Sequence, residues 1–267
     1  MKDYTEIHTF VICAYKESPY LEDCVRSLLD QKGKSRIIMA TSTPNTRISE
    51  VAETYHIPLF INNGEKGITR DWNFAYSHTE TPYVTIAHQD DLYLPDYTRL
   101  VIGGLKKAKR PLIAFTDYYE LKKDVRDDSA KNLRIKKFLL FPLRNPRLSE
   151  TRFFRRMSLA FGNSICCPSV TYVRQNLPDP VFTDGFFSNE DWEAWERLSR
   201  ESGAFVYLAR PLMCHRIHES SATSQIIGEH GRGKEDYTMF RKFWPSWIAR
   251  ILTRLYSASE SGNELDA

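Results

Sequence analysis

The chain has 267 residues, of which 42% are hydrophobic and 27% are charged, as in an average soluble globular domain. Its 12 glycines and 13 prolines exclude a collagen-like, low-complexity or globally disordered chain. A net charge of +3 is too balanced to indicate a nucleic-acid partner, and five cysteines without a CxxC pair predict neither a disulfide framework nor a zinc knuckle.

The N-terminal residues are polar and lack the features of a signal peptide, and no apolar run is long enough to span a bilayer. We therefore expect a cytoplasmic protein. Any membrane contact would be peripheral, at the inner face of the cell membrane.

The first 115 residues alternate between two patterns. Short apolar runs, typical of buried strands, occupy residues 8–14, 37–40, 57–61, 83–87 and 112–115. Between them, apolar residues recur at helical spacing, as at Leu21, Cys24, Val25 and Leu28. This alternation predicts an α/β fold, a mostly parallel sheet flanked by helices, with its active face at the carboxyl ends of the strands.

The second half of the chain is less regular. Residues 120–156 are rich in lysine and arginine and predict a long excursion over the active face. A strand over 164–173, a helix over 189–200 and a last strand over 204–208 follow.

The tail is expected to form a basic amphipathic helix interrupted at Pro245. We interpret residues 1–227 as the main domain and 228–267 as a C-terminal helical appendage. Residues 236–256 would contact either a membrane surface or protein, including a second subunit, and the pattern leaves both open.

Paired carboxylates carry the chemistry. Asp90 and Asp91 directly follow the apolar run at 83–87. Two adjacent anions at a strand end repel each other unless a cation or hydrogen-bond donors compensate them. A divalent ion bound to a nucleotide diphosphate would do so. A solvated Asp-Asp turn that begins the next helix is the simpler alternative.

Four segments together resemble a known family. TFVICAYKESPYLEDCVRSLLDQ resembles an opening strand, turn and helix, and NNGEKGITRDWNFAYSHTETPYVTIAHQDD resembles a glycine loop, helix and strand that ends in a DxD-type motif. NEDWEAWERL resembles an acceptor-side ED motif, and HRIHESSAT resembles a closing basic segment. Over residues 9–223 the chain resembles a family 2 glycosyltransferase of the GT-A fold.

The resemblance implies inverting transfer of a sugar from a nucleotide diphosphate sugar, with Mn²⁺ or Mg²⁺ as the cofactor. Asp91 would ligate the metal, and Asp90 would lie near the donor ribose or sugar and near that metal. Tyr15 and Glu17 would line the nucleotide pocket.

The match departs from the family at two positions. Thr41, followed by Ser42 and Thr43, stands where the family often has an aspartate that contacts the base, so we place Thr41 in the donor pocket. The acidic motif begins with the amide Gln89. Base contacts and metal affinity are the properties that these departures affect.

Further donor contacts are assigned to Arg70 and Asn73, on the helix after the glycine loop. Arg216 or His218 would neutralise charge on the leaving phosphate, and a histidine of the same segment would complete the metal shell. A solvent-facing basic strand end would explain the same alternation.

The general base is assigned to Asp191 by the resemblance, with Glu190 as the substitute. Acidic residues at a helix N-terminus also favour the macrodipole without any catalytic role. The acceptor implied is a polysaccharide or a lipid-linked oligosaccharide. A nucleotidyltransferase acting on a sugar phosphate and a non-catalytic nucleotide-sugar-binding scaffold are the alternatives.

Overall fold

The computed structural model describes residues 2–218 and 232–264. Their central feature is a nine-stranded sheet in the order β5-β4-β2-β6-β10-β8-β11-β7, with β9 paired to β8. The first half of the chain supplies β2 (His8–Ala14), β4 (Arg36–Thr41), β5 (Leu59–Ile61) and β6 (Tyr83–His88), which are all parallel. A separate pair, β1 (Lys2–Asp3) with β3 (Gly33–Lys34), lies near the N-terminus.

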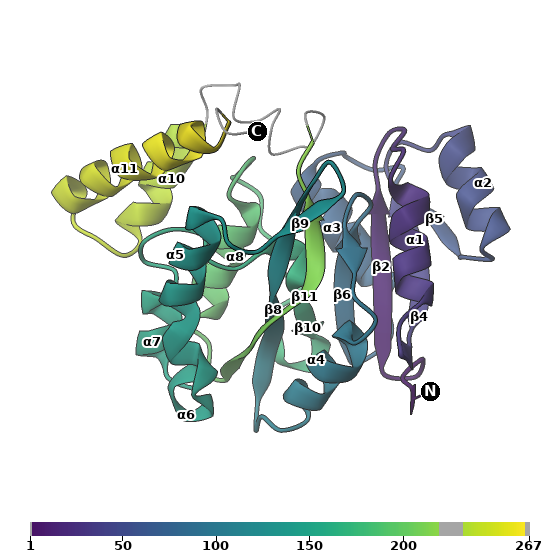
Figure 1. Cartoon of the computed structure of the whole chain (residues 1–267), viewed down its shortest axis with the longest axis horizontal. Helices are drawn as coiled ribbons and strands as arrows, with labels where there is room; N and C mark the ends of the chain where they lie inside the picture. Colours follow the sequence, from purple (N-terminus) through teal and green to yellow (C-terminus); the bar gives the residue numbers. More distant parts are fainter. Residues whose placement is uncertain (1, 219–231, 265–267) are drawn as a thin grey trace.

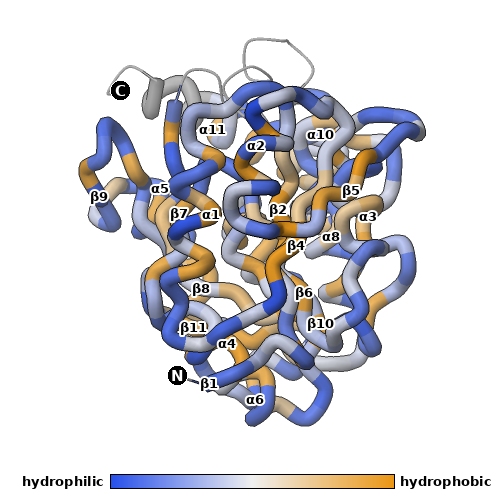
Figure 2. Tube along the Cα trace, turned by 90° about the vertical axis from the view of Figure 1, so that its right-hand side faces the viewer, coloured by the Kyte–Doolittle hydropathy of each residue, from blue (hydrophilic) through white to orange (hydrophobic). Residues whose placement is uncertain are grey.

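Helices cover both faces of the sheet because the strand side chains alternate between two cores. On β2, Phe10 and Ile12 face the core formed with α1 (Leu21–Leu29), α2 (Thr46–Thr54) and α4 (Tyr97–Leu105). Val11 faces the other core, with α3 (Ile68–Ser77) and α8 (Glu190–Leu198). Hydrophobic residues follow the central strands, while the outer loops are hydrophilic (Figure 2).

Two long strands dominate the second half of the sheet. β8 (Pro111–Lys122) and β11 (Ala204–Arg216) run parallel to each other, and β7 (Leu92–Tyr93) and β10 (Thr171–Val173) are antiparallel to their neighbours. The expected last strand over 204–208 is therefore too short. The expected strand over 164–173 is also wrong for most of its length, since Pro168 lies in a 3-10 helix, Cys167–Ser169, and only the last residues pair.

The expected basic excursion is folded. It contains β9 (Val125–Asp127), α5 (Lys131–Leu140), a 3-10 helix (Phe141–Arg144), α6 (Pro146–Ser149) and α7 (Arg152–Met157). A further 3-10 helix, Arg174–Asn176, follows β10. In Figure 1, α5, α6 and α7 flank the β8 side of the sheet, below the C-terminal helices.

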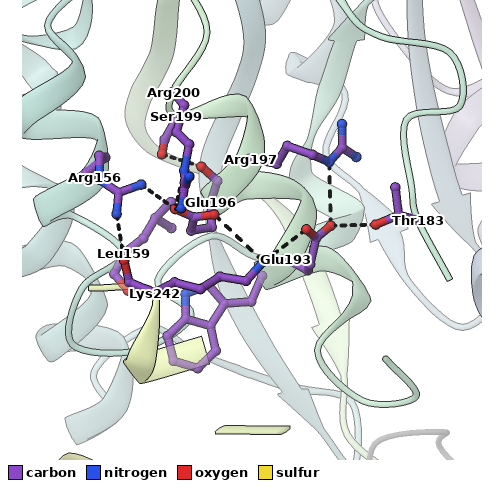
Figure 3. A network of polar contacts seen from close by, with 10 residues as sticks. Arg156, Leu159, Thr183, Glu193, Glu196, Arg197, Ser199, Arg200 and Lys242 are labelled. Atoms are coloured by element: carbon purple, nitrogen blue, oxygen red, sulfur yellow. Dashed lines mark hydrogen bonds and ion pairs between the residues drawn. The ribbon is translucent and has the colours of Figure 1, made fainter. Parts of the chain in front are cut away.

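The C-terminal helices α10 (Arg232–Arg241) and α11 (Ser246–Glu264) do not support the idea of a separate appendage. Met239, Phe240 and Ala249 are fully buried in the same core as Trp192. Polar contacts reinforce this packing, because Lys242 Nζ lies 3.1 Å from Glu193 Oε1 and the carbonyl of Lys242 accepts a hydrogen bond from Arg156 (Figure 3). The expected boundary between residues 227 and 228 lies outside the described residues and stays a prediction.

No helix in the described part of the chain combines the length and apolar character needed to cross a bilayer. The parallel strands point toward the upper edge in Figure 1, where Arg216 at the end of β11 contacts Asp90 and Asp91, which follow β6. That edge carries most of the side chains expected from the sequence.

Candidate active site

The site begins where the strand order reverses. β2 lies between β4 and β6, so the chain continues first to one side of β2 and later to the other. In open α/β sheets, ligands bind at the carboxyl ends of the strands at such a switch point. Gln89 joins the segments that follow β2 and β6. Its Oε1 accepts from the Tyr15 N–H at 3.0 Å, and its Nε2 donates to the Tyr15 carbonyl at 2.8 Å. An amide makes both bonds and a carboxylate makes only one, which gives the Gln89 departure a structural reason.

Asp91, three residues after the end of β6, is fully buried. Its Oδ1 accepts a hydrogen bond from the Arg216 N–H at 2.9 Å and lies 3.1 Å from His215 Nδ1. Burial tends to lower the pKa of His215, but the Asp91 carboxylate outweighs burial, so the pKa of His215 is raised. The end of β11 thus compensates a buried charge at the end of β6.

Asp90 has a different partner. Its Oδ2 lies 2.9 Å from His218 Nε2. Burial alone would raise the pKa of Asp90, but His218 and the nearby His88 and His215 rings outweigh it, so the pKa of this carboxyl lies below its usual value. Asp90 therefore stays ionised at neutral pH.

Arg216 fixes the geometry of this edge. Its guanidinium lies over the Tyr20 ring at 4.3 Å, and its Nε donates to the Asp90 carbonyl at 3.1 Å. Nη1 also pairs with Asp124 at 2.9 Å. Three segments from distant parts of the sequence are thereby held together.

A carboxylate also occupies the neighbouring strand ends, although none follows the second predicted strand in sequence. Thr41 is buried, and its hydroxyl accepts from the Thr43 N–H at 3.0 Å. Asp71, from α3, accepts from the Ser42 hydroxyl at 2.7 Å and from Asn62 Nδ2 at 2.9 Å. Sequence reasoning missed Asp71, because it lies on a helix far along the chain from Thr41.

The other proposed donor contacts have protein partners. Arg70 pairs with Glu65 at 2.5 Å and lies 3.5 Å from Asp184. Asn73 donates to the Phe182 carbonyl at 2.8 Å and accepts from the Phe182 N–H at 3.1 Å. Glu17 is exposed beyond β2. Their roles as donor contacts stay predictions.

Asp191 and Glu190 begin α8. Asp191 accepts hydrogen bonds from Asn163 Nδ2 and the Trp192 N–H, both at 2.7 Å, and Glu190 is buried. Cys166 lies three residues after Asn163 and is buried in the same cluster as Tyr118 and Leu133. Burial raises the pKa of the Cys166 thiol, Lys136 lowers it, and Asp91 and Asp191 both raise it.

Two groups emerge more clearly from the structure than from the sequence. His215 contacts Asp91 because β11 continues past its apolar first half, and the alternating HRIH segment was the available signal. Lys136 lies on α5, inside a stretch whose many cations gave no reason to single it out. Within residues 2–218 and 232–264, no three His, Cys, Asp or Glu side chains form a ready-made metal site.

This sheet, with paired carboxylates at its switch point, defines a GT-A type α/β transferase. The chain belongs to the family described as glycosyl transferase family 2, whose model matches residues 9–176, more than half of its length. The resemblance deduced from the motifs is confirmed. No curated protein matches the sequence.

Solved structures share the fold at low identity. TarS from S. aureus in complex with UDP-GlcNAc superposes with a TM-score of 0.63 at 13% identity, covering 92% of this chain and 70% of TarS. Glucosyl-3-phosphoglycerate synthase from Mycobacterium tuberculosis, in complex with Mn²⁺, UDP and phosphoglyceric acid, superposes with a TM-score of 0.57 at 15% identity, covering 90% of this chain and 80% of the synthase. The mannosyltransferase PcManGT from Pyrobaculum calidifontis, in complex with GDP-Man and Mn²⁺, superposes with a TM-score of 0.56 at 12% identity, covering 96% of this chain and 73% of PcManGT.

Proposed function

We propose that this glycosyltransferase moves a hexosyl group from a nucleoside diphosphate sugar to an acceptor hydroxyl, with inversion at C1 and with the help of Mn²⁺ or Mg²⁺. The observation that carries the proposal is the fully buried Asp91 carboxylate at the switch point, beside His215 and the ionised Asp90. Fixed anions at this place suit a dication and a diphosphate better than they suit a neutral ligand. The UDP-GlcNAc, UDP and GDP-Man named for the similar structures agree with such a donor.

The side chains at this edge fit a divalent ion in their donor chemistry. Asp91 and His215 would hold it, with Asp90 near by, and carboxylate and imidazole are ligands that Mn²⁺ accepts. The buried Nε2 of His88, two residues before Asp90, has no hydrogen-bond partner among the described residues. When bound, the ion would supply Lewis-acid stabilisation to the leaving diphosphate.

The chain's own residues would then carry out the transfer. Asp191, or Glu190 in its place, takes the proton from the acceptor hydroxyl while the oxygen of that hydroxyl forms the new bond to C1. The bond between C1 and the phosphate oxygen breaks, and the diphosphate leaves with the electron pair. His218 and Arg216 would neutralise the charge that develops on the leaving diphosphate.

The donor pocket would lie between the ends of β2 and β4. Tyr15 and Thr41 would line it, and Asp71, which accepts from the Ser42 hydroxyl, would provide the carboxylate that the segment after β4 lacks. The acceptor is a polysaccharide or lipid-linked saccharide, and the protein works in the cytoplasm at the inner membrane face. The exposed apolar stripe of α11 supports this placement: Trp247, Ile251 and Leu255 are 64%, 51% and 63% exposed.

The test is nucleotide binding by the Asp91→Asn variant. Calorimetry with UDP and GDP, with and without Mn²⁺, should show metal-dependent binding by the wild type. The variant should bind at least about tenfold more weakly in Mn²⁺, because one anionic ligand is lost while the shape is kept. Asp96→Asn is the control, since Asp96 forms surface ion pairs with Lys32 and Arg99. Equal metal-dependent binding by Asp91→Asn would defeat the metal assignment.

A further inference from the structure

Lys136 is an inward-facing lysine of α5. Leu133 and Leu140, three residues before and four residues after it, are buried and define the inner face of the helix. Lys136 Nζ donates to the Tyr118 hydroxyl at 3.0 Å and lies 5.5 Å from the Tyr118 ring centroid. The ammonium is therefore directed toward β8 and away from bulk solvent.

This ammonium lacks a counter-ion in the described part of the chain, where no carboxylate oxygen lies within 4.0 Å of it. The adjacent Lys137 differs, because its Nζ lies 3.0 Å from Asp128 Oδ2 and also donates to the Asp128 carbonyl. An ammonium has three protons to donate, and a neutral phenol takes only one of them. A half-buried charge in this state favours an anionic ligand.

Packing relates the ammonium to both parts of the candidate active site. The Tyr118 ring is 6.1 Å from the His215 ring, which contacts Asp91. Tyr118 also belongs to the same buried cluster as Cys166, three residues after Asn163, whose amide donates to Asp191. Lys136 is thus close to the region in which an acceptor would approach the donor sugar.

We propose that Lys136 binds an anionic group, a phosphate or a carboxylate, carried by the acceptor beside its reactive hydroxyl. This inference rests on the proposed function and specifies its acceptor class. The donor diphosphate has other compensating groups, namely His218, Arg216 and a metal at Asp91, whereas Lys136 reaches the site from α5, beside Tyr118 and the cluster that contains Cys166.

The experiment separates an acceptor anion from the donor diphosphate. Full-length wild type, Lys136→Gln, Lys136→Arg and the matched control Lys137→Gln are titrated calorimetrically with UDP and with GDP in Mg²⁺. Each protein, saturated with the tighter nucleotide, is then titrated with inorganic phosphate. We expect phosphate to bind the wild type, Lys136→Arg and Lys137→Gln. Its affinity for Lys136→Gln should be lower by about tenfold or more, while the nucleotide affinity of all four proteins stays the same.

Two results would overturn the inference. One is phosphate binding that is absent from the wild type or equally strong in Lys136→Gln. The other is a loss of nucleotide affinity in Lys136→Gln without a loss of phosphate affinity, which would assign Lys136 to the donor. If neither nucleotide binds the wild type, the proposed function fails, while a phosphate titration without nucleotide still tests Lys136. Melting temperatures of the variants identify any loss of folding.

Discussion

Asp90 and Asp91 are neighbours in sequence but are compensated separately. Asp91 accepts a backbone N–H from β11 and contacts His215, whereas Asp90 contacts His218 beyond the end of that strand. Each carboxylate thus has hydrogen-bonding partners of its own, which offset part of the repulsion between the two adjacent anions.

Asp191 provides the residue-scale test of the chemistry. In Asp191→Asn the Oδ1 can still accept from the Trp192 N–H, and the Asn163 amide can flip, since its buried Oδ1 has no hydrogen-bond partner among the described residues. The fold should therefore survive. Removing a general base should slow transfer by about 100-fold or more, with nucleotide affinity unchanged. The measurement is the initial rate of nucleoside diphosphate release with acceptor.

Glu190→Gln is the companion variant, because Glu190 adjoins Asp191 at the start of α8. We expect it to keep most of the wild-type rate. Full activity in Asp191→Asn together with a large loss in Glu190→Gln would move the base by one residue.

At the scale of elements, the sequence predicted those strands and helices whose formation depends on the local pattern of apolar residues. The strand ending at Ala14 and the helix beginning at Leu21 follow from apolar periodicity alone, and so does the position of Asp91 at a strand end. The second half of β11 was not predictable in this way, because Arg210 and Pro211 interrupt its apolar run and it is pairing with β8 that keeps it extended. The contact between His215 and Asp91 depends on that pairing.

The same limit applies to Asp71 and Lys136. Their partners, Ser42 and Tyr118, are distant in sequence and are brought close by helices crossing the sheet. No spacing rule relates such residues. The family resemblance identified the acidic motif. It could not identify side chains such as Asp71, which another element contributes where the family's own residue is missing.

β2 carries a buried histidine that makes stability depend on pH. His8 is fully buried, with Nδ1 2.8 Å from Ser35 Oγ and Nε2 2.9 Å from Thr85 Oγ1. Burial lowers the pKa of His8 to about 3. Between that value and the usual value of about 6.5, the unfolded chain binds more protons, so stability is lost as the pH falls.

We expect this histidine to cost about 2 kcal/mol in the free energy of unfolding between pH 7 and pH 5. The His8→Gln variant should have a smaller free energy of unfolding than the wild type at pH 7. Between pH 7 and pH 5, however, the variant should lose less of that free energy than the wild type, and the difference should be about 2 kcal/mol. Urea unfolding at both pH values measures the difference. His56→Asn, at an exposed position, is the control. An identical pH dependence in the wild type and His8→Gln would contradict the assignment.

At the scale of the whole molecule, α11 presents two apolar faces. Ala249 and Tyr256 pack against the core, whereas Trp247, Ile251 and Leu255 form an exposed stripe on the opposite side. The exposed cations Arg250 and Arg254 flank this stripe, and no acidic residue lies between Ser246 and Ser257. In a two-fold dimer through this face, arginines would approach arginines, so the charge favours an anionic bilayer surface over a second copy.

The stripe predicts binding to vesicles that contain anionic phospholipid. In co-sedimentation, Arg250→Gln with Arg254→Gln should lose about 2 kcal/mol of binding free energy, near 1 kcal/mol for each cation, and the loss should shrink in high salt. Trp247→Ser with Leu255→Ser should also weaken binding, because the apolar anchor is removed. Val125→Ser, at an exposed apolar position on β9, should have no effect. Concentration-dependent dimerisation that the same stripe variants abolish, without vesicle binding by the wild type, would assign this face to a second copy of the chain.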